Sequence, residues 1–142
     1  LYAMRQFDIE AFVVSPPELA LLPAFKAELD ARSTFYTEVA DVREVLDQVD
    51  VIYMEPVVQA DYTQSRVERA AETALTPDEY RITLELLHKQ AKRDAIVLHS
   101  LPRMDELTPD VDETRYGRYW VEAFNGVVMR MALLSLVLGT EE

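Results

Sequence analysis

The side chains best suited to chemistry are gathered in one short segment, residues 97–107, which reads Val-Leu-His-Ser-Leu-Pro-Arg-Met-Asp-Glu-Leu. An apolar run, Ala95–Leu98, leads into this segment, and Pro102 stiffens the turn that follows. A run that stops abruptly in a polar turn is typical of the carboxyl end of a parallel strand. Open α/β sheets hold their ligands at such ends. We therefore expect a functional site at this turn.

His99 and Arg103 each admit a chemical and a structural interpretation. Histidine is the usual proton carrier near neutral pH, so His99 could act as a general base; we favour a buried, hydrogen-bonded histidine at a strand end. Arg103 could grip an anionic substrate, or it could lock the loop by pairing with Asp105 and Glu106, which we favour slightly. His88, eleven residues before His99, should face solvent and does not have the spacing of a metal-ligand partner.

Alternating strands and helices must position these residues. Apolar runs predict strands at Ala11–Val14, Thr34–Tyr36, Val51–Met54 and Ala95–Leu98. Helical periodicity predicts helices over Glu18–Ala31, Asp41–Val49, Pro77–Arg93 and Val121–Leu138. The alternation indicates an α/β fold with a doubly wound, mainly parallel sheet of four to five strands and helices on both faces. The turns after Met54 and Leu98 should then be adjacent at one edge of a crevice.

Two of the expected helices carry start signals. The segment from Ser15 to Glu18 supplies a cap, two prolines and an early acid. Thr76, Pro77 and Glu79 fit a cap, a first helical position and a capping box. The preceding residues, 59–76, contain neither glycine nor proline. Because this stretch is too long for a simple connection, we expect a mobile substrate-side loop with a helical portion.

Composition limits the partners and the location of the protein. With 26 acidic and 14 basic residues among 142, its net charge of −12 argues against nucleic acid as a partner. The absence of cysteine excludes disulfides and thiol catalysis, and three glycines are too few for a glycine-rich nucleotide loop. The longest apolar stretch, Val127–Leu138, is shorter than a bilayer span, and no leader opens the chain. We expect a cytoplasmic protein without membrane contact.

The sequence motifs described above closely resemble the end of aspartate carbamoyltransferase catalytic chains, which belong to the aspartate/ornithine carbamoyltransferase family. The resemblance spans nearly the whole chain and implies that residues 1–142 form the amino-acid-binding, second domain of such a chain. The carbamoyl-phosphate domain, with its Ser-Thr-Arg-Thr phosphate loop, is expected to be absent, and the chain is expected to start inside a helix. The shared pieces, in the family's order, are Asp50–Met54, His99, Leu101–Arg103, Asp105–Glu106, Asp110–Asp112, Tyr119–Trp120, Asn125–Gly126 and Ala132–Leu134.

The resemblance implies four substrate-binding residues and no catalytic side chain. The main-chain oxygens of Leu101 and Pro102 would face the carbamoyl amino group and the incoming amine. Arg103 and Gln59 would complete the site. Gln59 matches the family's glutamine only if one residue is inserted before it. Ser100 departs from the proline that is usual at its position, which leaves the turn slightly less rigid.

A second departure concerns the acceptor substrate. Where relatives read Thr-Arg-Val-Gln, this chain reads Glu-Pro-Val-Val-Gln, so Pro56 stands at the place of the arginine that clamps the substrate's carboxylates. The adjacent Glu55 would repel a dicarboxylate. Either Arg66 or Arg69 reaches back from the long loop to replace that arginine, or the acceptor is not aspartate. A solvated helix face is an equal alternative for these two arginines.

By resemblance, the intact enzyme moves a carbamoyl group from carbamoyl phosphate to the amine of aspartate in pyrimidine biosynthesis. It would do so as a homotrimer and without a metal or organic cofactor. This chain alone is expected to be inactive, because phosphate-binding residues are absent. Two alternatives stay open: a paralogue that carbamoylates a different amine, and a non-catalytic binding or regulatory domain that keeps the fold.

Overall fold

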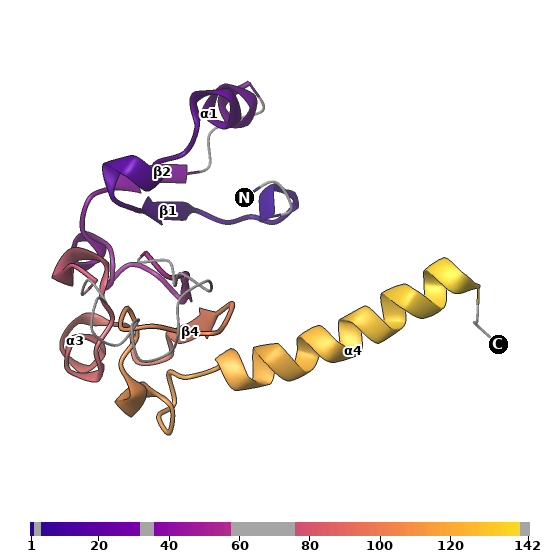
Figure 1. Cartoon of the computed structure of the whole chain (residues 1–142). Coiled ribbons are helices and arrows are strands. Elements are labelled where there is room, and N and C mark those ends of the chain that lie inside the picture. Colours follow the sequence, from indigo (N-terminus) through magenta and orange to yellow (C-terminus); the bar gives the residue numbers. More distant parts are fainter. Residues whose placement is uncertain (2–3, 32–35, 58–75, 140–142) are drawn as a thin grey trace, which may run out of the picture.

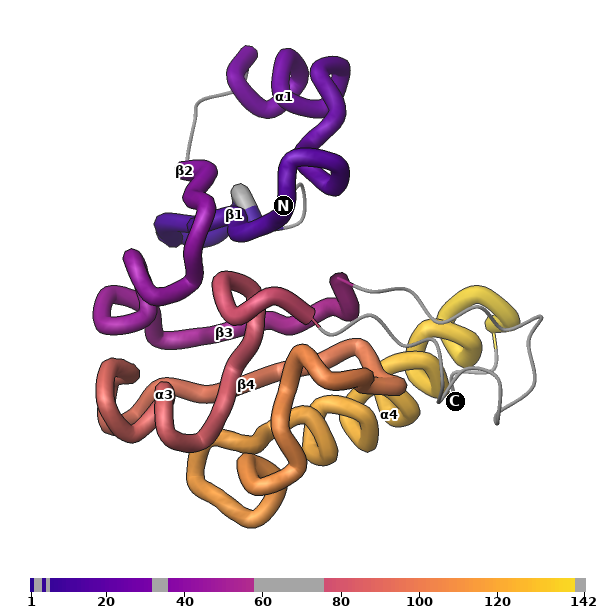
Figure 2. Tube along the Cα trace, turned by 60° about the vertical axis from the view of Figure 1, so that its left-hand side comes forward, coloured from indigo at the N-terminus to yellow at the C-terminus, as the bar shows by residue number. Residues whose placement is uncertain are grey.

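A computed structural model describes residue 1 and residues 4–31, 36–57 and 76–139. Figures 1 and 2 place the strand pair β1–β2, together with α1, on one side of β3, while β4, α3 and α4 lie on the other. The strands within the described residues are β1 (Ala11–Val14), β2 (Tyr36–Val39), β3 (Val51–Met54) and β4 (Ile96–His99), and the α-helices are α1 (Pro23–Asp30), α3 (Leu84–Gln90) and α4 (Tyr119–Leu138).

The strands pair in parallel, which confirms the expected α/β class. β1 runs beside β2 with Ala11 opposite Tyr36, and β3 runs beside β4 with Val51 opposite Ile96. In the described residues these are two two-stranded sheets rather than one sheet of four to five strands. β1 and β3 are not paired with each other, and both line a cavity of about 520 Å³.

The second strand extends further than expected. β2 spans Tyr36–Val39, whereas the sequence predicted a strand that ends at Tyr36; residues 34 and 35 of that prediction lie outside the described part of the chain.

β4 has a further neighbour on the side away from β3. The Val97 N–H donates to the Tyr116 carbonyl over 2.8 Å, and the Arg118 N–H donates to the Val97 carbonyl over 2.9 Å. This short bridge at Gly117 gives the β3–β4 pair a third, strand-like edge.

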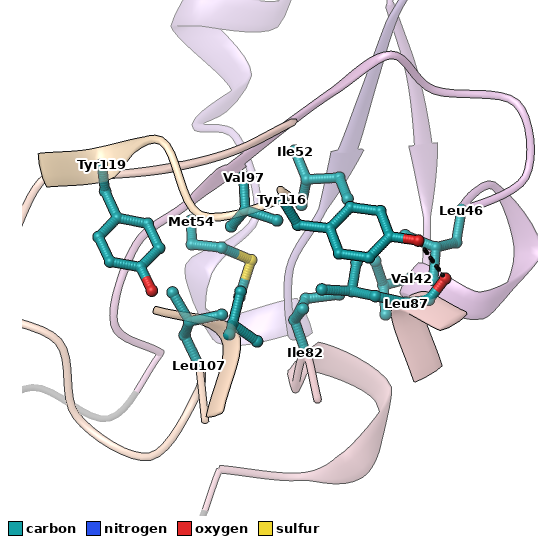
Figure 3. Close-up of a cluster of buried hydrophobic side chains, with 11 residues drawn as sticks. Val42, Leu46, Ile52, Met54, Ile82, Leu87, Val97, Leu107, Tyr116 and Tyr119 are labelled. Atoms are coloured by element: carbon teal, nitrogen blue, oxygen red, sulfur yellow. Dashed lines mark hydrogen bonds between the residues drawn. The ribbon is translucent and has the colours of Figure 1, made fainter. Parts of the chain in front are cut away.

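The hydrophobic core lies around β3 and β4 (Figure 3). Along β3 the side chains alternate between exposed and buried, so Ile52 and Met54 point into the core while Val51 and Tyr53 do not. Burying each large aliphatic side chain stabilises the fold by about 1.5–3 kcal/mol relative to leaving it exposed. The completely buried members that join the strands to the rest of the chain are Leu46, Ile82, Leu87, Leu107, Val111 and Tyr119.

Three of the expected helices are shorter than predicted. Within Glu18–Ala31, only Pro23–Asp30 is α-helical, preceded by a 3₁₀ turn at Pro17–Leu19. Asp41–Val49 contains a single 3₁₀ turn, Val42–Glu44, which the Asp41 carboxylate caps by accepting from the Arg43 N–H at 2.8 Å.

The Pro77–Arg93 prediction fails for a tertiary reason. The Ile82 N–H donates to the Glu106 carbonyl over 2.7 Å, and the Thr108 N–H donates to the Ile82 carbonyl over 3.1 Å. This bridge holds Ile82 extended, so α3 starts afterwards, and Thr83 caps it by accepting from the Leu86 N–H at 3.1 Å. Thr76 is therefore not the cap of this helix.

Helix α4 extends away from the rest of the molecule (Figure 1). It begins at Tyr119, earlier than the apolar run suggested, and ends at Leu138. The next residue, Gly139, has a φ of 65°, the left-handed conformation common after helices. Its twenty residues make it long and apolar enough, by length and composition alone, to cross a membrane. The helix is thus longer than the apolar stretch Val127–Leu138 on which the sequence expectation rested. Beyond its first residues the helix has no buried face, and its apolar side chains are exposed.

Candidate functional site

The turns that follow β3 and β4 lie side by side. The parallel register places Met54 opposite His99, and the Ser100 hydroxyl donates to the Glu55 carboxylate over 2.6 Å. This confirms the expected adjacency of the two strand ends. It also shows that Ser100 and Glu55, both departures from the pattern of the resembling family, contact each other.

His99 has the structural role favoured from the sequence. It is 2% exposed, and its Nε2 lies 2.6 Å from Oε1 of Glu106. The ring Nδ1 of His99 accepts from the Leu101 N–H at 2.8 Å. The backbone N–H of His99 donates to the Glu122 carboxylate over 2.9 Å. His88 is exposed, as expected.

The turn itself consists of Leu101 and Pro102, joined by a cis peptide bond. Leu101 has a φ of 53°, in the left-handed region, which is costly for any residue with a Cβ. No donor in the described ranges reaches the carbonyl oxygen of either residue. These two oxygens are therefore available as acceptors for a ligand.

Arg103 locks the loop, but through a different partner than expected. Its guanidinium forks onto Asp112, with Nη2 2.9 Å from Oδ2, and the same carboxylate accepts from the Tyr119 hydroxyl. The prediction that Asp105 and Glu106 pair with Arg103 was wrong, because those two carboxylates bind elsewhere. The Arg103 hydrogen bond holds the pKa of the Asp112 carboxyl below its usual range, while burial and the Asp112 carboxylate raise the pKa of Tyr119.

Asp105 fastens this loop to the segment that precedes the 3₁₀ turn at Asp78–Tyr80. Its two carboxylate oxygens accept from the backbone N–H and the hydroxyl of Thr76, each over 2.7 Å. The Arg81 Nε donates to the Asp105 carbonyl over 3.1 Å. Thr76 is buried and donates to Asp105 through both its N–H and its hydroxyl, so it attaches this segment to the distant loop and does not cap a helix.

The described edge of the site is acidic. Tyr53 stands at the end of β3, and desolvation, followed by the charges of Glu55 and Glu122, raises its pKa. Arg103, the nearby cation, is already bound to Asp112. An anionic substrate would therefore need positive charge from residues other than these.

Sequence reasoning identified part of this arrangement. Leu101, Pro102 and Arg103 lie together in the turn, whereas Gln59, Arg66 and Arg69 lie outside the described residues. It missed the roles of Glu106 and Glu122 as acceptors within the turn. The signal available for Glu122 was its place in the first turn of an expected helix that follows the site. Among the described residues, no cluster of three or more His, Asp or Glu could hold a metal ion.

Comparison with known proteins identifies the family. A family model described as the Asp/Orn binding domain of aspartate/ornithine carbamoyltransferase matches residues 1–137. The chain belongs to this family. The catalytic subunit of aspartate carbamoyltransferase from Hyperthermus butylicus is 41% identical over 130 residues, which cover 92% of this chain and 40% of that protein. The catalytic subunit from Methanopyrus kandleri is 36% identical over 145 residues, covering 97% and 43%.

Solved structures agree with this carbamoyltransferase assignment. The catalytic subunit of M. jannaschii aspartate transcarbamoylase matches with a TM-score of 0.77 at 28% identity, over 99% of this chain and 44% of that one. The Trypanosoma cruzi enzyme in complex with aspartate and phosphate matches with a TM-score of 0.69 at 26% identity, over 92% and 39%. The chain thus spans about two fifths of the length of the relatives it matches.

Proposed function

We propose that this chain binds the acceptor amine in an aspartate carbamoyltransferase. The observation that carries this proposal is the turn at Leu101 and Pro102, which presents two acceptor oxygens beside the end of β3 in a chain whose family match covers residues 1–137. The relatives named above are aspartate carbamoyltransferase catalytic subunits, and one structural neighbour binds aspartate and phosphate.

In the proposed reaction, the acceptor's amine attacks the carbamoyl carbon of carbamoyl phosphate. A carbon–nitrogen bond forms, the bond from that carbon to the phosphate oxygen breaks, and the amine loses a proton. Carbonyl oxygens accept hydrogen bonds from N–H groups, so Leu101 and Pro102 suit both the carbamoyl NH₂ and the attacking amine. Holding the two nitrogens in a fixed geometry lowers the entropic part of the barrier.

An acceptor other than aspartate is the second candidate. Glu55 is held at the site edge by the Ser100 hydroxyl, 2.6 Å away, and Pro56 has no charge with which to bind a carboxylate. A carboxylate at this position repels a dicarboxylate and attracts an amine that carries a second positive charge. Gln59, Arg66 and Arg69 are the residues through which the long loop would favour aspartate instead.

The helix α4 is proposed to pack against protein rather than lipid. The family match runs to residue 137 and so includes nearly all of this helix. We further propose a homotrimer in the cytoplasm, as the resemblance implied. Sedimentation of the purified complete polypeptide at several concentrations tests the trimer, and a stable monomer or dimer would contradict it.

Product analysis tests the function. The complete polypeptide to which these 142 residues belong is incubated with carbamoyl phosphate and one amine at a time: aspartate, ornithine and a panel of cationic and neutral amines. Mass spectrometry identifies the product, and phosphate release without amine corrects for spontaneous hydrolysis. Carbamoyl aspartate is the expected product. Turnover with a different amine alone would support the paralogue, and no turnover with any amine would support a non-catalytic domain.

A further inference from the structure

The buried pair formed by His99 and Glu106 is placed to control the backbone of the site. Both side chains are fully buried, and their contact is 2.6 Å long. Because the Leu101 N–H donates to Nδ1 of His99, that nitrogen must be unprotonated, and Nε2 carries the hydrogen that Glu106 accepts. The hydrogen-bond network thus fixes one tautomer of the ring.

Glu106 binds both ends of the turn. Its carboxylate accepts from His99, which precedes the turn, and from the Met104 N–H, which follows it, at 2.9 Å from Oε1 and 3.2 Å from Oε2. Between them, Leu101 adopts a φ of 53°, which an L residue adopts only when its surroundings impose it. The contact from its own N–H to His99 is the hydrogen bond that holds it there.

The N–H groups and the carbonyl groups of this turn differ in their hydrogen bonding. Side chains accept from the N–H groups of His99, Leu101 and Met104. The carbonyl oxygens of Leu101 and Pro102 receive no hydrogen bond from the part of the chain that the structure describes. Side-chain acceptors therefore fix the backbone while the carbonyl oxygens stay available to a ligand.

We propose that His99 and Glu106 are positioning residues for carbamoyl transfer. The pair holds Leu101 in the conformation that directs the two carbonyl oxygens at the reacting nitrogens, without touching the substrates. This inference rests on the proposed function. The competing interpretation is a buried polar pair that stabilises the fold and has no influence on the reaction.

The contact from Leu101 to His99 can be tested by itself. It joins a side-chain acceptor to the N–H two residues later, which is the geometry of an Asx turn, so asparagine at position 99 can also accept from the Leu101 N–H. Leucine at position 99 cannot. Combining either change with Glu106→Gln avoids leaving a buried unpaired charge. The His99→Asn/Glu106→Gln and His99→Leu/Glu106→Gln variants therefore differ chiefly in this one hydrogen bond.

The kcat for carbamoyl transfer and the KM for each substrate are measured in the complete polypeptide. We expect the asparagine variant to have a kcat at least about ten-fold above that of the leucine variant, since a 1 Å displacement of a positioning group can cost about 10²-fold in rate. The KM for carbamoyl phosphate should be similar in both. Leu46→Val, a change in the buried core outside the turn, serves as a control that lowers Tm and leaves kcat unchanged.

Equal kcat values in the two double variants, with an active wild type, would overturn the inference and leave the proposed function standing. An inactive wild type would overturn both. Where the leucine variant does not fold, Glu106→Met alone is compared with wild type. Methionine has a similar size but removes the acceptor of both the His99 and the Met104 hydrogen. A kcat equal to that of wild type would likewise overturn the inference, and a fall of ten-fold or more at unchanged carbamoyl phosphate KM would support it.

Discussion

The loop after the site should depend on the carboxylate of Asp112. We predict that Asp112→Asn destabilises the fold at neutral pH. Asp112 accepts hydrogen bonds from both terminal nitrogens of Arg103 and from the Tyr119 hydroxyl. Asparagine has nearly the same shape but keeps one acceptor oxygen and turns an NH₂ group toward the donors, so at least one of these hydrogen bonds becomes a clash between donors.

The size of the effect follows from the burial of the pair. The side chains of Arg103 and Asp112 are 18% and 23% exposed. A hydrogen bond to a charged group contributes about 1.5–3 kcal/mol, and breaking a fully buried ion pair costs about 3–5 kcal/mol. Because the pair is partly solvated, we expect a loss of about 2–3 kcal/mol in the free energy of unfolding, between these two cases.

Urea unfolding of the 142-residue chain measures this loss. Trp120 is the only tryptophan of the chain, and its ring centroid lies 5.4 Å from that of Tyr119, so its fluorescence reports on this region. The measurement is repeated across pH. The pKa of Asp112 is lowered in the folded state, so its contribution is complete above the ordinary carboxyl pKa of about 3.9 and disappears as the pH falls through the lower, folded value.

The difference between wild type and Asp112→Asn should therefore be constant from about pH 8 to 5 and narrow below about pH 4. Asp50→Asn is the matched control, because it removes the same charge from a pair with Lys92 in which Asp50 is 78% exposed. That change should have no measurable effect. The reasoning fails if Asp112→Asn is no more destabilising than Asp50→Asn, or if its effect stays undiminished in strong acid.

Three further predictions concern the packing, the acceptor and the isolated chain. Gly117→Ala should lower the free energy of unfolding in urea by about 1–3 kcal/mol, because the added Cβ would lie 2.8 Å from the Val111 carbonyl oxygen. Gly126→Ala is the control, since its Cβ would meet only the flexible side chain of Arg130, and it should not destabilise the fold. Equal effects of the two changes would contradict this prediction. Pro56→Arg should tighten aspartate binding in the complete polypeptide by about ten-fold to a hundred-fold if it restores a charge-assisted pair; unchanged affinity, with binding abolished by Arg66→Ala, would mean that the long loop already provides the cation. The 142-residue chain alone should show no carbamoyl transfer, since its sequence lacks a phosphate loop, and turnover above background would refute this.

The sequence predicted the elements that are continuous apolar runs. β1, β3 and β4 occupy the predicted positions within a residue, because each is a short, largely apolar run that contains the β-branched residues favoured in strands. The adjacency of the turns after β3 and β4 followed from parallel pairing alone. β2 extends past the predicted end at Tyr36, because the polar Thr37 and Glu38 pair with Phe12 and Val13 of β1, which the composition of this segment did not indicate.

Contacts between distant residues account for most of the errors. Thr76 has the sequence of a helix cap, yet its hydroxyl binds Asp105, 29 residues away. Arg103 has two acidic neighbours in sequence, yet it binds Asp112. In both cases a local pattern offered an adequate partner and the fold supplied another, which local spacing does not reveal.

The position of Glu122 gives α4 a mechanical property. This residue lies in the first turn of the helix and accepts from the backbone N–H of His99, so the helix is attached to the site at its start. A helix of twenty residues is about 30 Å long, so a tilt of about 10° about its origin would swing the far end by about 5 Å and move Glu122 by less than about 1 Å. The far end of α4 can therefore move by several Å, together with any surface that binds it, while the start of the helix hardly moves. The carbonyl oxygens of Leu101 and Pro102 then keep their positions.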